Sequence, residues 1–169
     1  MESIKKFNKL NKTEFISIFG NIFEKTEWIA EKCYELKPYK NFQELVSKMM
    51  EIFENTNQEK HLKILNSHPD LAVAKKLTED SKNEQTGANL NNCTEKEFKE
   101  FEELNEKYKK KFGFPFIIAV KGKNKEEILN NFRQRITNDI NLEFEEAKKQ
   151  VKKIASLRLS EIKKYEKIY

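Results

Sequence analysis

The residues best suited to chemistry gather around one of the two histidines in this 169-residue chain. His68 precedes Pro69 in the stretch LNSHPDLA, at 65 to 72, where a helical pattern breaks. A residue before proline is disfavoured in the α region and proline suits a first helical turn, so we expect His68 at a helix entrance. There the helix dipole disfavours the imidazolium and a bound anionic substrate favours it, so the ring could exchange a proton near neutral pH. The simpler interpretation is a plain helix-start turn, with Asp70 placed for the dipole.

A second polar segment, Ser81 to Gln85, also has two interpretations. Ser81 and Glu84 have the spacing of a capping box, in which both side chains satisfy N–H groups at a helix start. Glu84 and Gln85 also provide the acceptors and donors that a urea or imide group requires. Taken alone, these residues favour the capping box over the binding group.

Three arginines stand out in a chain that otherwise uses lysine for positive charge. The guanidinium is a planar fork that matches a carboxylate. Arg133 and Arg135 are equally well explained as ordinary surface residues. Arg158 is the sharper candidate, because it follows Ile154 by four residues near the apolar side of a long predicted helix.

The elements that must position these side chains are helices. A capping residue followed three positions later by Glu marks helix starts, and apolar residues at spacings of three and four follow most of them. The pairs are Asn11 with Glu14, Asn41 with Glu44, Thr56 with Glu59, Ser81 with Glu84, Thr94 with Glu97, and Asn124 with Glu127. The last helix is expected from about Leu142 to Tyr165. The pattern predicts an all-α fold, as a single compact multi-helix domain over residues 1–169.

One segment, FGFPFIIAV at about 112–120, is apolar without a helical period and has Gly and Pro near its start. We expect it to be extended and buried. An extended segment without a neighbouring strand needs side chains, other backbone or a ligand to bond its peptide groups. This segment is therefore a candidate pocket wall.

Composition excludes several classes of protein. The formal charge of +5 comes from 33 basic and 28 acidic residues that are mostly interleaved, which is weak evidence for a nucleic-acid partner. No apolar run is long enough for a membrane span, and the two cysteines lack metal or redox spacing. No nucleotide-binding, serine-hydrolase or zinc motif is present. We expect a cytoplasmic protein with no metal and no cofactor.

Five segments together resemble one known family in order and spacing. They are SHPDLA at 67–72, SKNEQTGANL at 81–90, LNEKYKKKFGFPFIIAVKG at 104–122, ILNNFRQRITN at 128–138 and KKIASLRL at 152–159. The family is the decarboxylase of 2-oxo-4-hydroxy-4-carboxy-5-ureidoimidazoline (OHCU), the last enzyme of the route from urate to allantoin. The stretch from Phe15 to Ala30 resembles its N-terminal pattern, so the resemblance covers nearly the whole chain.

The resemblance implies an all-helical, cofactor-free enzyme that converts OHCU to (S)-allantoin and CO2. It makes His68 the catalytic acid or base, Glu84 its main polar partner, and Arg158 the residue that grips a carboxylate or carbonyl. It places the following residues against the substrate: Pro69, Ser81, Gln85, Phe116, Ile117, Ile118, Ala119 and Val120. The chain departs from the family at Asn89, where Gly is usual, and at Lys121, where Arg is usual. Asn tolerates the left-handed conformation, and lysine keeps the charge.

The implied partner is a small-molecule substrate, with no nucleic acid and no membrane. A homodimer would fit the family, but the apolar faces could equally all be internal. Two alternatives stay open. One is a decarboxylase or other lyase of the same fold that acts on another ureido or imidazoline acid. The other is a basic helical interaction module that docks through its long C-terminal helix.

Overall fold

Helices make up most of the chain, which a computed structural model describes at residues 2–72 and 77–165, leaving aside the side chains of 2, 3, 164 and 165. No strand occurs among these residues, so the predicted all-α class is confirmed. The chain forms two compact units, Met1–Ser67 with Lys152–Tyr169, and His68–Val151. A single domain over residues 1–169 stays a prediction.

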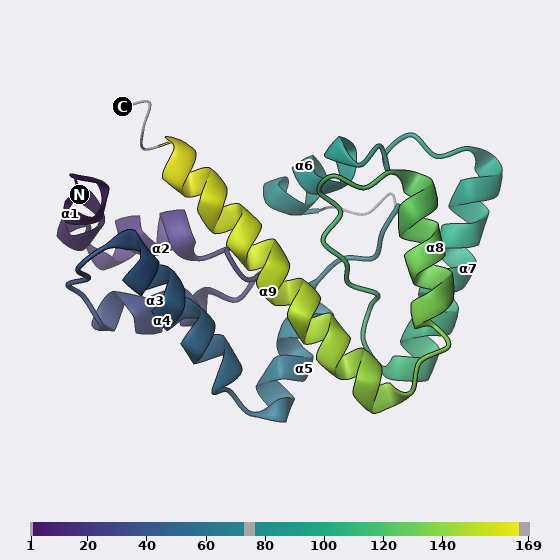
Figure 1. The fold of residues 1–169 in the computed structure, drawn as a ribbon, viewed down its shortest axis with the longest axis horizontal. Coiled ribbons are helices and arrows are strands. Elements are labelled where there is room, and N and C mark those ends of the chain that lie inside the picture. Colours follow the sequence, from purple (N-terminus) through teal and green to yellow (C-terminus); the bar gives the residue numbers. More distant parts are fainter. Residues whose placement is uncertain (1, 73–76, 166–169) are drawn as a thin grey trace. The chain divides into compact units, whose positions relative to one another are not determined.

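In its described residues, the first unit contains five helices and the C-terminal part of the longest one (Figure 1). These elements are α1 (Glu2–Lys9), α2 (Lys12–Phe19), α3 (Glu27–Glu35), α4 (Phe42–Glu54), α5 (Gln58–Ser67) and the end of α9 (Ile140–Tyr165). Helix α3 packs against both α2 and α4. Phenylalanines dominate the core: Phe23 stacks on Phe53 with ring centroids 5.0 Å apart, and both are fully buried.

The second unit, outside residues 73–76, contains three helices and the first part of α9. They are α6 (Glu79–Gly87), α7 (Glu95–Phe112) and α8 (Lys125–Arg135), of which α7 packs against α8. Phe116 stacks on Phe132 with centroids 3.9 Å apart, and the edge of Tyr108 meets both rings. The aromatic core therefore joins α7 and α8 to the segment between them.

Four of the six predicted helix starts are confirmed by side-chain caps, at Asn11, Asn41, Thr94 and Asn124. The start predicted at Thr56 is wrong by one residue. Helix α5 begins at Gln58, and the side-chain oxygen of Asn57 accepts from the N–H of Lys60 at 2.9 Å. Asn is at least as good an N-cap as Thr, so the neighbouring asparagine takes the role.

The segment after α7 is buried from Phe114 to Val120 and is not helical, as predicted, but Phe112 is the last residue of α7. Gly113 ends the helix in the left-handed region, with φ +79° and its N–H bonded to the carbonyl of Lys109. Glycine adopts this conformation without a Cβ clash, which makes it the usual residue past a helix end.

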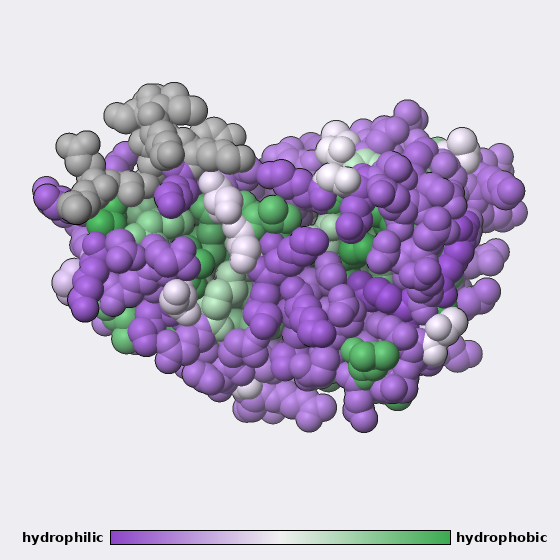
Figure 2. All heavy atoms as spheres, viewed as in Figure 1, coloured by the Kyte–Doolittle hydropathy of each residue, from purple (hydrophilic) through white to green (hydrophobic). Residues whose placement is uncertain are grey.

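The long helix α9 carries its apolar stripe inward. Ala147, Val151, Ala155 and Leu159 are all buried. On the face drawn in Figure 2, hydrophilic side chains cover most of the second unit, and hydrophobic residues show more widely over the first. Among the described helices, none is both long and apolar enough to cross a membrane.

Candidate active site

His68 directly follows Ser67, the last residue of α5, and residues 69 to 72 are not helical. The predicted helix entrance is therefore wrong: the histidine follows the end of one helix. Proline disfavours the α region for the residue before it, which explains why α5 stops at Ser67. The carbonyl end of a helix attracts positive charge, the opposite of the expected influence. His68 is buried, with 8% of its surface exposed.

The loop that begins at His68 is held by the side chain of Gln85 on α6. The amide of Gln85 donates to the carbonyl of Asp70 and accepts from the N–H of Ala72, each at 3.1 Å. Ala72 has φ +53°, in the left-handed region that a residue with a Cβ rarely adopts. The two hydrogen bonds of Gln85 therefore hold a strained turn, and both of its polar atoms are engaged by the loop.

Helix α7 holds the same loop from another element. Asn105 donates to the carbonyl of Leu71 at 3.0 Å, and the ammonium of Lys109 lies 2.7 Å from the carboxylate of Asp70. Residues four apart share a helix face, so one side of α7 provides both contacts. The sequence interpretation missed Asn105 and Lys109, although their spacing was visible.

Helix α6 presents Ser81, Glu84 and Gln85 on one face, because residues three and four apart are neighbours there. The capping interpretation of Ser81 is wrong: Thr78 is the N-cap, and its hydroxyl accepts from the N–H of Ser81. Ser81 lies inside the first turn and is buried, and Glu84 is half-buried. A binding role for this face stays a prediction, and its Gln85 already bonds the loop after α5.

The turn after α6 confirms the reasoning about Asn89. Its φ of +61° is left-handed, the conformation for which the family usually has glycine. The N–H of Leu90 then bonds the carbonyl of Gln85 at 2.9 Å. Asparagine is the residue after glycine that best tolerates this geometry, so the helix end is preserved.

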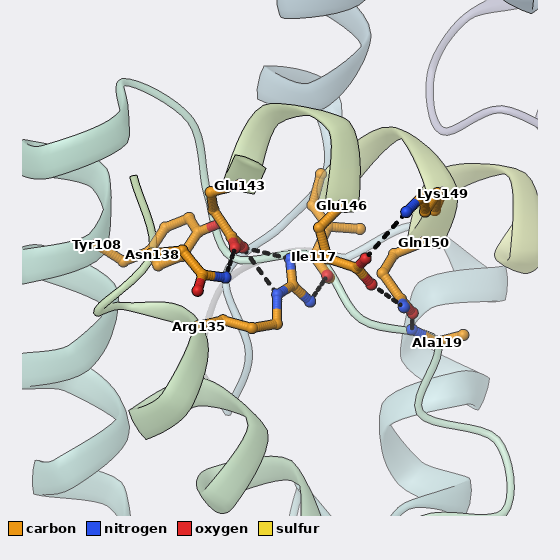
Figure 3. Close-up of polar contacts among 9 residues, drawn as sticks. All are labelled: Tyr108, Ile117, Ala119, Arg135, Asn138, Glu143, Glu146, Lys149 and Gln150. Carbon is orange, nitrogen blue, oxygen red and sulfur yellow. Dashed lines mark hydrogen bonds and ion pairs between the residues drawn. The ribbon is translucent and has the colours of Figure 1, made fainter. Parts of the chain in front are cut away.

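Two side chains bond the backbone of the buried segment (Figure 3). The guanidinium of Arg135, at the end of α8, donates to the carbonyl of Ile117 at 2.7 Å. The side-chain oxygen of Gln150, on α9, accepts from the N–H of Ala119 at 3.0 Å. The surface interpretation of Arg135 is therefore wrong, whereas Arg133 does lie on the surface and pairs with Glu100.

Glu143 anchors Arg135 in a buried polar cluster. Its carboxylate, fully buried, accepts hydrogen bonds from Arg135, from the phenol of Tyr108 and from the amide of Asn138. Burial raises the pKa of Tyr108, and the hydrogen bond to Glu143 raises it further. The carboxylate and the guanidinium balance each other where neither could be buried alone.

Arg158 belongs to the first unit, where both of its partners also lie. Its guanidinium is 2.8 Å from the carboxylate of Glu24 and donates to the carbonyl of Asn21 at 2.8 Å. Arg158 and Glu24 are both buried. Glu24 lies within the N-terminal pattern at Phe15 to Ala30, but the sequence interpretation gave it no role.

His61, the other histidine, fills the core of the first unit. Its Nε2 lies 2.8 Å from the carbonyl of Phe53, and the edge of its ring meets the phenyl ring of the same residue. Across residues 2–72 and 77–165, no group of three or more His, Cys, Asp or Glu side chains is arranged to hold a metal ion.

The second unit thus combines a buried histidine on a strained loop, a helix face with a carboxylate, and a buried segment held through its backbone. These features define an all-α protein with a candidate active site in the second unit. The OHCU decarboxylase family model matches residues 8–160, and the chain belongs to this family.

Relatives support the assignment. The chain is 42% identical to the uric acid degradation bifunctional protein of Bacillus sp. (strain TB-90) over 96% of its length, but spans only 32% of that protein. It is 35% identical to the OHCU decarboxylase of Haloferax volcanii, covering 94% of this chain and 95% of the relative.

Two crystal structures share the fold. One, of (S)-allantoin synthase, has a TM-score of 0.75 at 28% identity and covers 94% of this chain and 53% of its own. The other, of OHCU decarboxylase in the presence of (S)-allantoin, has a TM-score of 0.68 at 27% identity and covers 80% and 89%.

Proposed function

We propose that the protein is a carboxy-lyase that converts OHCU to (S)-allantoin and CO2, the last step of urate degradation to allantoin. The observation that carries the proposal is the match of the family model over residues 8–160, together with a chain-length relative named for this reaction. The chain covers 95% of that relative but only about a third of the bifunctional one, so the chain-length relative is the better guide to the activity.

His68 is the acid or base of the reaction in this proposal. When the carbon–carbon bond to the carboxylate breaks, CO2 leaves and its bonding electrons pass into the unsaturated ring. A proton must then be delivered to one face of the carbon, so that one enantiomer forms. A buried imidazole on a loop held by Gln85 and Asn105 suits that step, because proton transfer requires a donor in a defined position.

Glu84 and the buried segment complete the proposed site. Glu84 orients the histidine and the ring, and the backbone of residues 116–120 lies along the ligand, with Pro69, Ser81 and Gln85 as further lining residues. Gln85 contributes through the loop it holds, since both of its polar atoms bond Asp70 and Ala72. The role of Arg158 rests on the family resemblance, which implies that it binds a carboxylate or carbonyl.

The chemistry needs no cofactor in this proposal, because the substrate's own ring accepts the electron pair. A cytoplasmic location and a homodimer stay predictions. The second candidate function has another ureido or imidazoline acid as the substrate. Apolar residues set the shape of the pocket, and that shape decides which of these acids is bound.

The first experiment generates OHCU freshly from urate with purified upstream enzymes, adds the protein, and follows optical activity at the wavelengths of allantoin. We expect wild type to speed formation of one enantiomer and His68→Asn to leave only slow racemic decay. Circular dichroism of both proteins checks that they are folded. A folded wild type without effect on fresh OHCU would refute the assignment and direct the search to other ureido acids.

A further inference from the structure

The hydrogen bonds of the buried segment alternate along the chain. The carbonyl of Ile117 is bonded by Arg135 and the N–H of Ala119 by Gln150, two residues apart. Within the described ranges, no hydrogen bond is formed by the backbone of Ile118, which lies between them and is 5% exposed. Both side chains that bond the segment come from α8 and α9 (Figure 3).

In an extended chain, the N–H and C=O of one residue point to the same side, and those of the next residue point to the other. The bonds at residues 117 and 119 therefore turn both peptide groups toward α8 and α9. The N–H and C=O of Ile118 then point away from these helices. They form a donor and an acceptor side by side, and buried backbone groups need partners.

A ureido or imide group carries a C=O and an N–H next to each other, the complement of that pair. Such a group can accept from the N–H of Ile118 and donate to its C=O, as two residues do in the hydrogen-bonded pair of an antiparallel ladder. The proposed substrate and product both contain this group.

We propose that Arg135 and Gln150 are positioning residues, which fix the register of the segment so that the backbone of Ile118 binds the ureido or imide group of the substrate. The inference rests on the proposed function and adds residues that never touch the ligand. Arg135 suits this role because it is itself fixed, by Glu143 and by stacking 4.5 Å over the ring of Phe116.

Gln150 gives the cleaner test, because it is only half-buried, whereas loss of Arg135 would leave Glu143 buried without its counter-charge. Gln150→Met keeps the length of the side chain and removes the acceptor for the N–H of Ala119. Gln134→Met is the matched control: the same substitution at an exposed glutamine of α8 that bonds the segment nowhere. We expect kcat/KM for fresh OHCU to fall about tenfold in Gln150→Met and to stay within about twofold in the control.

Rescue distinguishes positioning from simple support of the fold. The amide of Gln150 also donates to Glu146 at 2.8 Å, so Gln150→Glu is combined with Glu146→Gln to avoid two adjacent carboxylates. This double variant retains an oxygen that can accept from Ala119, so its kcat/KM should lie between those of wild type and Gln150→Met. All variants are compared at matched thermal stability, measured by circular dichroism. If the double variant and Gln150→Met are equally impaired, or if activity follows only the unfolding temperature, the positioning role is refuted.

Amide hydrogen exchange, read residue by residue by NMR, tests the geometry with (S)-allantoin as the probe. In wild type, allantoin should slow exchange at Ile118 and leave Ala119, already bonded, nearly unchanged. In Gln150→Met, exchange at Ala119 should speed up without ligand, and the effect of allantoin at Ile118 should weaken. Protection at Ala119 but not at Ile118 would overturn the inference.

The two proposals fail in different ways. If wild type neither decarboxylates OHCU nor binds allantoin, the proposed function fails and the inference falls with it. If wild type is active and Gln150→Met matches it, only the inference is overturned.

Discussion

The fold raises the pKa of the Tyr108 phenol, which shares its partner Glu143 with Arg135. It is buried and donates to the carboxylate of Glu143, and both effects raise its pKa above the ordinary value. The neutral phenol therefore stabilises the fold fully below about pH 10. As the pH rises beyond that value, the unfolded chain releases the proton first and this contribution is lost.

A spectrophotometric titration at the tyrosinate band measures this. We expect Tyr108→Phe and wild type to give the same absorbance change up to the pH of alkaline unfolding, because Tyr108 does not ionise in the native protein. The variant should also lose about 2 kcal/mol of unfolding free energy in urea, since Glu143 loses one hydrogen bond. A smaller native amplitude in the variant near pH 10 would contradict the expectation.

Single residues were predictable where a local rule acts on them. Asn89 could be placed in the left-handed conformation because few other residues tolerate it. Arg135 could not be distinguished from Arg133, since both are arginines near the end of one helix. Only the packing of α8 decides that one meets Glu143 and the other meets solvent.

At the scale of elements, helix α6 shows how close two interpretations of one segment can be. Thr78 and Ser81 are both capping residues followed by acidic residues, and a shift of three positions decides which one starts the helix. With Thr78 as the cap, Ser81 is free of that role and lies on the same face as Glu84. The structure thus separates a stabilising residue from a candidate binding residue.

Matched alanine substitutions test this separation. Thr78→Ala should lower the free energy of unfolding by about 1 kcal/mol, the usual cost of losing an N-cap, and change kcat/KM little. Ser81→Ala should lower kcat/KM for OHCU, and the loss expressed as free energy should exceed its loss of unfolding free energy. Urea unfolding and initial rates on the same preparations decide, and the reverse pattern would restore Ser81 as the cap.

Most helices were predictable from their ends, because caps at Asn11, Asn41, Thr94 and Asn124 act over three or four residues. The loop after α5 was not. Its conformation depends on Gln85 and Asn105, which lie 15 and 34 residues from their partners in the sequence. Contacts at that range require the fold to be known first.

At the scale of the whole molecule, the distribution of charge argues against the alternative of a basic interaction module. The net charge of +5 is spread over interleaved acidic and basic residues, several of them paired within a helix. The apolar stripe of α9, the proposed docking face of that alternative, is buried from Ala147 to Leu159. A helix whose apolar side is already covered has little to offer a partner.

Retention on an immobilised nucleic-acid column tests the alternative. We expect elution at low salt, because a protein that neutralises few phosphates releases few counterions. Binding that persists above about 0.2 M salt, with a steep salt dependence, would favour an interaction module. A lysine-rich nucleic-acid-binding domain run on the same column calibrates the scale.

The segment at 114–120 has a further consequence for how specificity is inherited. The recognition elements that we propose there are the N–H and C=O of Ile118, which every residue except proline provides. The residue types at these positions can therefore change while the ligand stays the same, so long as Gln150 and Arg135 hold the backbone of the segment in place. Under this proposal, residues that do not contact the substrate help to determine which substrate binds.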